Sequence, residues 1–206
     1  MTEADVQALG RAGQTSTSLL VRVKALDTEA WGRFVYLYGP LVYEWCRRMG
    51  LQDADASDVG QDVFRAVFGA IGRFERNSGQ GSFRKWLKSV TNNKVRDFAR
   101  SKRRGAEGVG GSDALARLLE IAADPASDPN DADAPSDEVL LLRRAVELVL
   151  ADLSEETRQA FWQVVAEGRD PADVARELGL SVNAVYLVKS RVKRRIREEF
   201  DGLVEG

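Results

Sequence analysis

Apolar residues recur every three or four positions along most of the chain, which is the spacing of amphipathic α-helices. Helices are therefore expected over about 19–26, 28–49, 53–75, 83–104, 137–149, 155–167, 171–178 and 182–197. No segment alternates between apolar and polar residues over the length of a strand. The pattern predicts an all-α protein.

Residues that begin and end helices stand at the edges of these segments. The side chains that can cap helix N-termini are Asp27, Asp55 or Ser57, Ser82, Ser154, Asp170 and Ser181. The glycines that can end helices are Gly50, Gly168 and Gly179. Pro40 stands inside the segment 28–49, and we expect a kink or a break there because proline has no backbone N–H.

The composition changes between residues 105 and 136, which are rich in Gly, Ala, Asp and Pro. Residues 105–140 contain nine acids and one base. The whole chain has 32 acids and 30 bases, so 23 acids and 29 bases lie outside this segment. The rest of the chain therefore carries a net charge of about +6. We expect a flexible acidic linker over 105–136, with one short helix at 113–122. It would join two small helical domains at 15–104 and 137–200. A binding face can therefore be basic although the whole chain carries −2.

The chain contains no histidine and a single cysteine, Cys46. Structural zinc sites, imidazole-dependent nucleophilic catalysis and a disulfide within the chain are therefore excluded. No glycine-rich phosphate loop is present, so we expect neither an enzyme nor a bound cofactor or metal. No apolar run approaches the roughly 18 residues that span a membrane, and no signal peptide opens the chain, so we expect a cytoplasmic protein that makes no membrane contact.

The segment Asp170–Arg197 has the pattern of a helix-turn-helix. A short helix begins at Pro171 and ends at Gly179, and a second helix follows Ser181 after a turn of about three residues. The bases of the second helix are Lys189, Arg191, Lys193, Arg194, Arg195 and Arg197. This density of positive charge suits a phosphate backbone. An ordinary α-hairpin with a solvated basic face would show the same pattern.

Two helices of the first half carry polar residues that could bind a partner. Asp58, Gln61, Asp62 and Arg65 share one side of the segment 53–75, opposite its apolar side, and such a face is either solvated or a contact surface. The segment 83–104 combines early aromatic residues, two central amides and bases toward its end, which suit base stacking, base contacts and phosphate contacts respectively. Its aromatic residues could equally belong to the core.

Four motifs occur in a fixed order along the chain. The first is DASDVGQDVF at 55–64, and the second is SFRKWL at 82–87, with two asparagines at 92–93. The third and fourth lie at 153–161 and 173–185. Together they resemble the bacterial RNA polymerase sigma factors of the extracytoplasmic-function (ECF) type, the two-domain group of the sigma-70 family. The resemblance covers residues 16–200.

The resemblance implies a transcription-initiation sigma factor that directs core RNA polymerase to promoters, melts the minus-ten element and reads the minus-thirty-five element. Its implied partners are the clamp helices and flap of the polymerase, and promoter DNA that is double-stranded or locally melted. The implied polymerase contacts are Asp55, Asp58, Gln61, Asp62 and Arg65. The implied minus-ten contacts are Phe74, Asn77, Ser82, Phe83, Trp86, Asn92, Asn93, Arg96 and Arg100. The implied minus-thirty-five contacts are Ser181, Asn183, Ala184, Tyr186, Leu187, Ser190, Arg191 and Arg194.

The chain departs from the family pattern at positions that bear on function. Ser57 stands where an acid is usual, and Gly60 where a larger apolar residue is usual, which weakens the helix by up to about 1 kcal/mol. Phosphorylation of Ser57 by a Ser/Thr kinase would restore the missing negative charge. In the second helix of the helix-turn-helix, Tyr186 and Val188 replace basic residues that are frequent in the family. The promoter sequence that this helix reads is therefore expected to be unusual.

Two other functions fit parts of this sequence. A conventional helix-turn-helix repressor or activator would use only the C-terminal domain on DNA, while the N-terminal domain senses a signal or dimerises. An interaction protein, such as an anti-activator decoy, would bind partners rather than DNA through its basic faces. Regulation by an anti-sigma protein, by a kinase or by expression alone would leave the same sequence.

Overall fold

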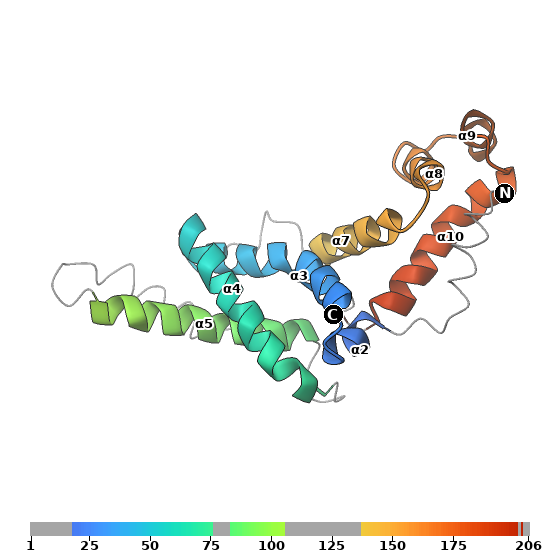
Figure 1. Ribbon diagram of the computed structural model, residues 1–206. Coiled ribbons are helices and arrows are strands. Elements are labelled where there is room, and N and C mark those ends of the chain that lie inside the picture. Colours follow the sequence, from blue (N-terminus) through green and yellow to red (C-terminus); the bar gives the residue numbers. More distant parts are fainter. Residues whose placement is uncertain (1–17, 76–82, 106–136, 202, 204–206) are drawn as a thin grey trace. The chain divides into compact units, whose positions relative to one another are not determined.

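The computed structural model describes residues 18–75, 83–105, 137–201 and 203 (Figure 1). Its elements are α2 (Leu19–Lys24), α3 (Thr28–Arg48), α4 (Asp53–Ala70), the 3-10 helix η2 (Ile71–Arg73), α5 (Phe83–Gly105), α7 (Asp137–Ala151), α8 (Glu155–Val165), α9 (Pro171–Leu178) and α10 (Val182–Glu199). No strand occurs among the described residues, and the all-α prediction is confirmed. The short helix expected at 113–122 and the linker expected at 105–136 lie outside the described residues, apart from the end of α5.

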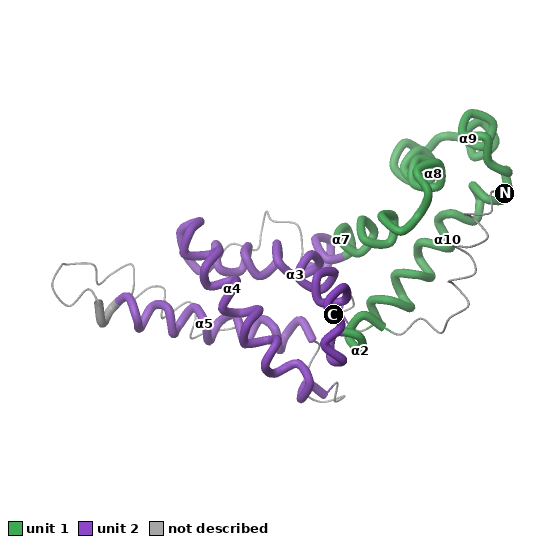
Figure 2. The backbone as a smooth tube through the Cα atoms, viewed as in Figure 1, with its two compact units in different colours: residues 1–22, 142–201 green, residues 23–141, 202–206 purple. Residues whose placement is uncertain are grey.

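The chain divides into two units, which Figure 2 colours separately. Unit 1 comprises residues 1–22 and 142–201, and unit 2 comprises residues 23–141 and 202–206. The start of α7 belongs to unit 2 because its first two residues bond to α3 and α5. The Asp137 carboxylate accepts hydrogen bonds from the Trp45 indole N–H at 3.0 Å and from Arg48 at 3.4 Å, and Glu138 pairs with Arg84 at 3.2 Å.

Unit 2 is built on three long helices, α3, α4 and α5, which pack on one another around an aromatic core. Side chains at helical spacing fill the interface, and α3 alone buries residues at eight positions between 30 and 46. The large and fully buried side chains of this core are Phe34, Leu37, Tyr38, Leu41, Trp45, Ile71, Phe83 and Leu87. Asp27 caps α3 as predicted, its carboxylate accepting a 2.9 Å hydrogen bond from the Ala30 amide.

Two local predictions in unit 2 need correction. Of the kink or break expected at Pro40, the break does not occur, because α3 continues from Thr28 to Arg48. Leu37 and Leu41, on either side of the proline, are each only 1% exposed, so packing holds both halves in one helix. Neither Asp55 nor Ser57 caps α4. This helix begins earlier, after Gln52, whose side chain makes no capping hydrogen bond.

Unit 1 contains a helix-turn-helix, formed by α9 and α10, with α8 packed against both. The predicted caps are confirmed: Ser154, Asp170 and Ser181 accept hydrogen bonds from backbone amides at the starts of α8, α9 and α10. Gly179 ends α9 in the left-handed conformation, at φ +66°, which residues with a Cβ rarely adopt. The small core between these helices consists of Ala160, Val174, Ala175 and Val185.

The described helices include none that could cross a membrane.

Candidate functional site

α4 turns one polar face to solvent. Every third or fourth residue on its inner side is buried, namely Ala56, Val59, Val63 and Val67. Ser57, Asp58, Gln61, Asp62 and Arg65 are exposed on the opposite side. Four of the five residues with implied polymerase contacts therefore share an accessible surface, which we call the α4 polar face.

Arg65 is held in place within the α4 polar face. Its guanidinium pairs with the Asp62 carboxylate one turn earlier and donates a 3.4 Å hydrogen bond to the Gln61 side-chain oxygen. Such exposed pairs on one helix contribute only about 0.3–0.5 kcal/mol to stability. Their effect is on geometry, since they order a base and an acid side by side on an accessible helix surface.

Asp55 differs from the other members of the implied set. Its side chain is 26% exposed, and one carboxylate oxygen lies 2.8 Å from the Lys102 ammonium group on α5. Lys102 also lies over the Phe98 ring, 4.8 Å from its centroid. Asp55 therefore joins α4 to the basic end of α5, a contact that the sequence motif does not predict.

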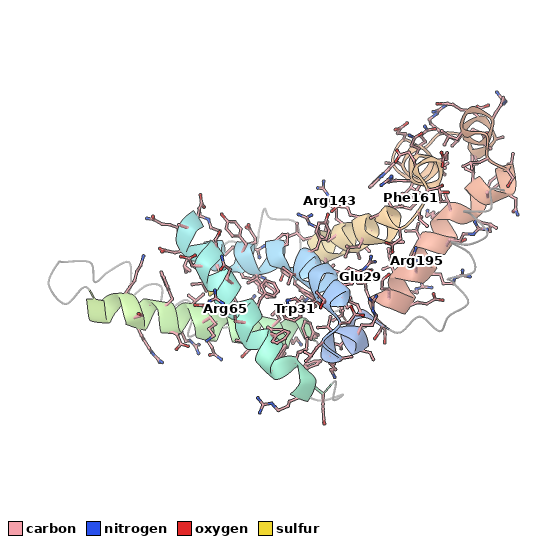
Figure 3. All side chains as sticks on the ribbon, viewed as in Figure 1. Glu29, Trp31, Arg65, Arg143, Phe161 and Arg195 are labelled. Carbon is pink, nitrogen blue, oxygen red and sulfur yellow. The ribbon has the colours of Figure 1, made fainter. Side chains whose placement is uncertain are left out.

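An apolar groove of about 630 Å³ runs between α3 and α4, beside the α4 polar face. Aromatic side chains from both helices line it, among them Trp31 on α3 and Phe64 and Phe68 on α4; Figure 3 labels Trp31 and Arg65 on the two helices. Phe68 is 48% exposed, so its ring is accessible at the edge of the groove. A Cβ at Gly39 or Gly60 would meet no heavy atom within 4 Å, so these two glycines leave the groove open.

Sequence reasoning missed this groove. The residues that form it can be read in the sequence, namely the glycines at 39 and 60 and the aromatic residues of the two helices. The hydrophobic pattern, however, does not reveal which helices face each other. Ser57 also lines the groove, as the fifth residue of α4 and one residue beyond its first turn. The serine is therefore exposed, but the helix dipole acts on it less strongly than on a first-turn residue.

The start of α5 contributes an aromatic cluster rather than an open stacking surface. Phe83 is 1% exposed and Phe74 is 9% exposed, with their ring centroids 5.1 Å apart. Trp86 is half-buried on the same cluster, 5.1 Å from Phe74 and 5.3 Å from Phe83. In these positions the rings of Phe74 and Phe83 are covered by their neighbours and pack within the cluster. Trp86 is the one of the three that is partly rather than fully buried.

The two adjacent asparagines in the middle of α5 differ in their exposure to solvent. Asn92 is 6% exposed and faces the core. Asn93 is exposed, and its side-chain oxygen accepts a 3.4 Å hydrogen bond from Arg96. Arg100 is exposed one turn further along. Asn77 and Ser82 lie outside the described residues.

α10 presents the other polar surface. Val185, Val188 and Val192 are buried, each at 2% exposure or less, and they fix which side of the helix faces outward. The outward side carries Asn183, Tyr186, Leu187, Ser190 and Arg194, with Ala184 and Arg191 half-exposed. Tyr186, at 63%, is the most exposed of the large hydrophobic residues that the structure describes. These residues therefore share the accessible side of α10.

Several polar groups of α10 have structural tasks. The Ser181 hydroxyl accepts a 3.1 Å hydrogen bond from the Ala184 amide, and the Ser190 hydroxyl donates one of 2.9 Å to the Leu187 carbonyl. Arg195 pairs with Asp152 at 2.8 Å, which ties α10 to the end of α7 within unit 1. The Arg194 guanidinium lies 3.7 Å from the Glu198 carboxylate, which partly balances its charge. The Arg194 side chain is nevertheless exposed.

The described residues offer little for metal or nucleophilic chemistry. No group of three or more Cys, Asp or Glu among them has a metal-binding arrangement. Cys46 is fully buried on α3, and burial raises the pKa of its thiol to about 12. The thiol is therefore protonated at neutral pH and is not an activated nucleophile.

Two family models match the chain over the segments that carry these surfaces. Residues 34–105, which include the α4 polar face and α5, match the model of sigma-70 region 2. Residues 143–196, which include α8, α9 and most of α10, match the model of sigma-70 region 4.

Two relatives resemble the chain over most of its length. The RNA polymerase sigma factor CnrH of Cupriavidus metallidurans is 32% identical over 167 residues, covering 77% of this chain and 80% of CnrH. A probable RNA polymerase sigma factor, RfaY of Xanthomonas campestris, is 28% identical over 183 residues, covering 86% of this chain and 43% of RfaY. A solved structure of CnrH in complex with the cytosolic domain of CnrY matches with 24% identity and a TM-score of 0.35, covering 86% of this chain and 92% of that one.

Proposed function

This chain belongs to the ECF group of the sigma-70 family and directs core RNA polymerase to promoters, and we propose how its surfaces divide that task. The α4 polar face binds the polymerase, α5 engages the minus-ten element, and α10 reads the minus-thirty-five element. The observation that carries this proposal is the exposure of Asp58 and Asp62 on a helix whose opposite side is buried. The protein acts as a specificity subunit in the cytoplasm and not as an enzyme.

The polymerase contact is proposed for Asp58, Gln61, Asp62 and Arg65, with Asp55 at its edge. A face that mixes acids, an amide and a base is complementary to a charged coiled coil, which is the expected nature of the clamp helices. The neighbouring groove adds apolar surface from Trp31 and Phe68 beside these polar groups. The contact thus combines an apolar centre with a polar rim, as stable protein interfaces do. The polymerase flap is the proposed partner of unit 1.

The minus-ten contact is proposed for the exposed side of α5. Trp86 supplies a stacking surface, Asn93 a polar contact, and Arg96 and Arg100 phosphate contacts. Asn77 and Ser82, beyond the described residues, stay in the proposal on the resemblance alone. Phe74, Phe83 and Asn92 remain as positioning residues: their burial fixes the orientation of Trp86 and of α5.

The minus-thirty-five contact is proposed for the outward side of α10. Asn183, Tyr186, Leu187 and Ser190 would face base edges, with Ala184 beside them, while Arg191 and Arg194 contact phosphates. Ser181 acts mainly by capping the helix that carries them. The minus-ten contact belongs to the domain proposed at 15–104, and the minus-thirty-five contact to the domain proposed at 137–200. Residues 105–136 are proposed to join these two domains as an acidic linker.

We further propose that phosphorylation of Ser57 by a Ser/Thr kinase strengthens polymerase binding. The hydroxyl is exposed and lies one turn before Gln61 on the α4 polar face. A phosphate there would add about −1.5 to −2 charge where the family usually carries an acid. A Ser57→Glu variant should bind core polymerase more tightly than wild type, and a Ser57→Ala variant should bind equally. An anti-sigma protein covering the same face would instead compete with core.

The proposed function is tested with purified components. Core RNA polymerase and this protein should co-elute in size-exclusion chromatography and should produce run-off transcripts from a subset of a promoter library. A conventional helix-turn-helix regulator would bind DNA without joining core polymerase. A mixture of core polymerase and such a regulator would yield no promoter-specific transcript. Absence of both co-elution and transcripts would therefore favour the conventional regulator.

A further inference from the structure

The first two turns of α10 expose large apolar side chains. Tyr186 is 63% exposed, Val182 42% and Leu187 38%. Asn183, Tyr186, Leu187 and Ser190 stand at positions i, i+3, i+4 and i+7 of the helix, so they form one continuous line on its surface. We call these four residues the α10 stripe. Two of its four side chains present hydrocarbon on the surface that is proposed to face base edges.

The charge along α10 favours DNA as the partner of the stripe. Residues 181–197 contain six bases and no acid, and the first of these bases is Lys189. Lys189, Lys193, Arg194 and Arg197 are exposed and suit the phosphates of a duplex. The centre of a protein interface is depleted of charged residues, so a positive surface of this density fits a protein partner less well. The apolar side chains occupy the N-terminal part of the helix, which contacts base edges in helix-turn-helix proteins.

The side chains of the α10 stripe distinguish between base pairs. Leu187 has no polar side-chain atom, and the Ser190 hydroxyl donates its proton to the Leu187 carbonyl at 2.9 Å. In the major groove, thymine presents a C5-methyl group, the one methyl group of the four bases. A G·C pair in the same place would set polar groups against hydrocarbon, where they lose their hydrogen bonds to water. Lys and Arg, which commonly read guanine, are absent from residues 182–188.

We propose that Leu187 and the ring of Tyr186 contact thymine methyl groups, so that this protein recognises its minus-thirty-five element through thymines at adjacent base pairs. The inference rests on the proposed assignment of α10 to that element and adds the class of base that is read. The two residues are neighbours in the chain, with a rise of about 1.5 Å along the helix, and adjacent base pairs are about 3.4 Å apart. Their side chains therefore reach neighbouring steps of one groove.

Removing single methyl groups from the DNA tests the proposal. The full-length protein, alone and bound to core polymerase, first enriches its preferred sequence from a library of random duplexes. Each thymine of that sequence is then replaced in turn by deoxyuridine, which lacks the methyl group and still pairs with adenine, and affinities are compared by competition. At two adjacent base pairs we expect a loss of about fourfold for each methyl group. Equal affinity at every position, or no enriched sequence in either form, would overturn the proposal.

Run-off transcription from the enriched sequence is scored separately, so the proposed function and the thymine contact can fail independently. A sequence that the protein binds in a methyl-dependent way, but from which the complex with core polymerase makes no transcript, would contradict the proposed function and support the thymine contact. Transcripts from a sequence whose binding does not depend on thymine methyl groups would support the proposed function and overturn the thymine contact.

Protein variants assign each methyl contact to its side chain. Leu187→Ala should fold, because the side chain is partly exposed and alanine favours helices, and at one position it should lower the ratio of thymine to deoxyuridine affinity from about four to about one. Tyr186→Ala should do the same at the adjacent position, whereas Tyr186→Phe, which keeps the ring, should retain the ratio.

Leu142→Ala is the matched control for these variants, since Leu142 is 48% exposed on α7 of the same unit. It should keep the wild-type ratio of thymine to deoxyuridine affinity at every position. If Leu187→Ala and Tyr186→Ala weakened binding to core polymerase and left the ratios unchanged, the α10 stripe would be a protein contact, and the proposal would be wrong.

Discussion

The Lys102 ammonium group lies 2.8 Å from the Asp55 carboxylate, joining the end of α5 to the first turn of α4. The pair connects the helix proposed to bind DNA with the helix proposed to bind polymerase, within one unit. Because Asp55 is 26% exposed and Lys102 53% exposed, the pair is partly screened by water. In the proposed polymerase contact, Asp55 is therefore a residue already paired with a base of its own unit.

A double-mutant cycle should measure this pair. With Asp55→Asn, Lys102→Gln and the double variant, we expect a coupling of about 0.2–1 kcal/mol in the free energy of unfolding at low salt. The coupling should fall toward zero in 1 M salt, where the Debye length is about 3 Å. Urea unfolding supplies the measurement. A coupling that does not change with salt would show that the two residues interact other than by charge.

Charge reversal on α10 should weaken promoter binding. For Arg191→Glu combined with Arg194→Glu, we expect lower affinity for a promoter duplex and a salt dependence shallower by about 2 in the slope of log K against log salt, because each lost phosphate contact contributes about 0.9. Arg143→Glu on α7 serves as the control, since this exposed base lies outside α10. An unchanged slope in the double variant would remove these arginines from the phosphate contacts.

The buried thiol of Cys46 predicts a decline in stability at alkaline pH. Burial raises its pKa to about 12, whereas the unfolded thiol ionises near pH 9. Between these values the folded state holds a proton that the unfolded state has lost, so the free energy of unfolding falls by about 1.4 kcal/mol per pH unit from this group. Replacing the thiol by Cys46→Ala should flatten that part of the curve, although it lowers stability overall by leaving a small cavity.

Urea unfolding between pH 8 and pH 10 provides the comparison. Wild type should lose stability over this range more steeply than Cys46→Ala, and the difference should vanish below pH 8. Tyr38 is present in both proteins, so its own alkaline ionisation cancels. Parallel curves over the whole range would contradict the assignment of the decline to Cys46.

Local signals in the sequence were enough to predict most helix ends. Asp27, Ser154, Asp170 and Ser181 cap the helices that follow them, and Gly179 ends α9 at positive φ. Each depends on groups within four residues along the chain, so neighbouring sequence decides the outcome. The outward side of α10 was predictable for the same reason, because the buried valines fix its orientation.

Long-range packing explains what the sequence could not reveal. Pro40 disfavours a helix locally, yet buried residues on both sides keep α3 continuous. Phe83 and Asn92 belong to motifs implied to bind DNA, but the packing of α5 against α3 and α4 buries them. The groove beside α4 and the hydrogen bond from the Tyr38 hydroxyl to the Leu203 carbonyl both depend on partners far away in the sequence. Periodicity identifies a buried side without identifying what covers it.

The central claim is that the α4 polar face binds core RNA polymerase, and one affinity measurement tests it most directly. The variant Asp58→Lys with Asp62→Lys is compared with a control of equal charge change, Glu29→Lys with Glu75→Lys, whose acids are exposed elsewhere in unit 2. Both should fold, because all four side chains are exposed. We predict that the first variant loses at least about tenfold in affinity for core polymerase, or 1.4 kcal/mol, while the control stays within about twofold of wild type. Wild-type affinity in the Asp58→Lys, Asp62→Lys variant would contradict the account.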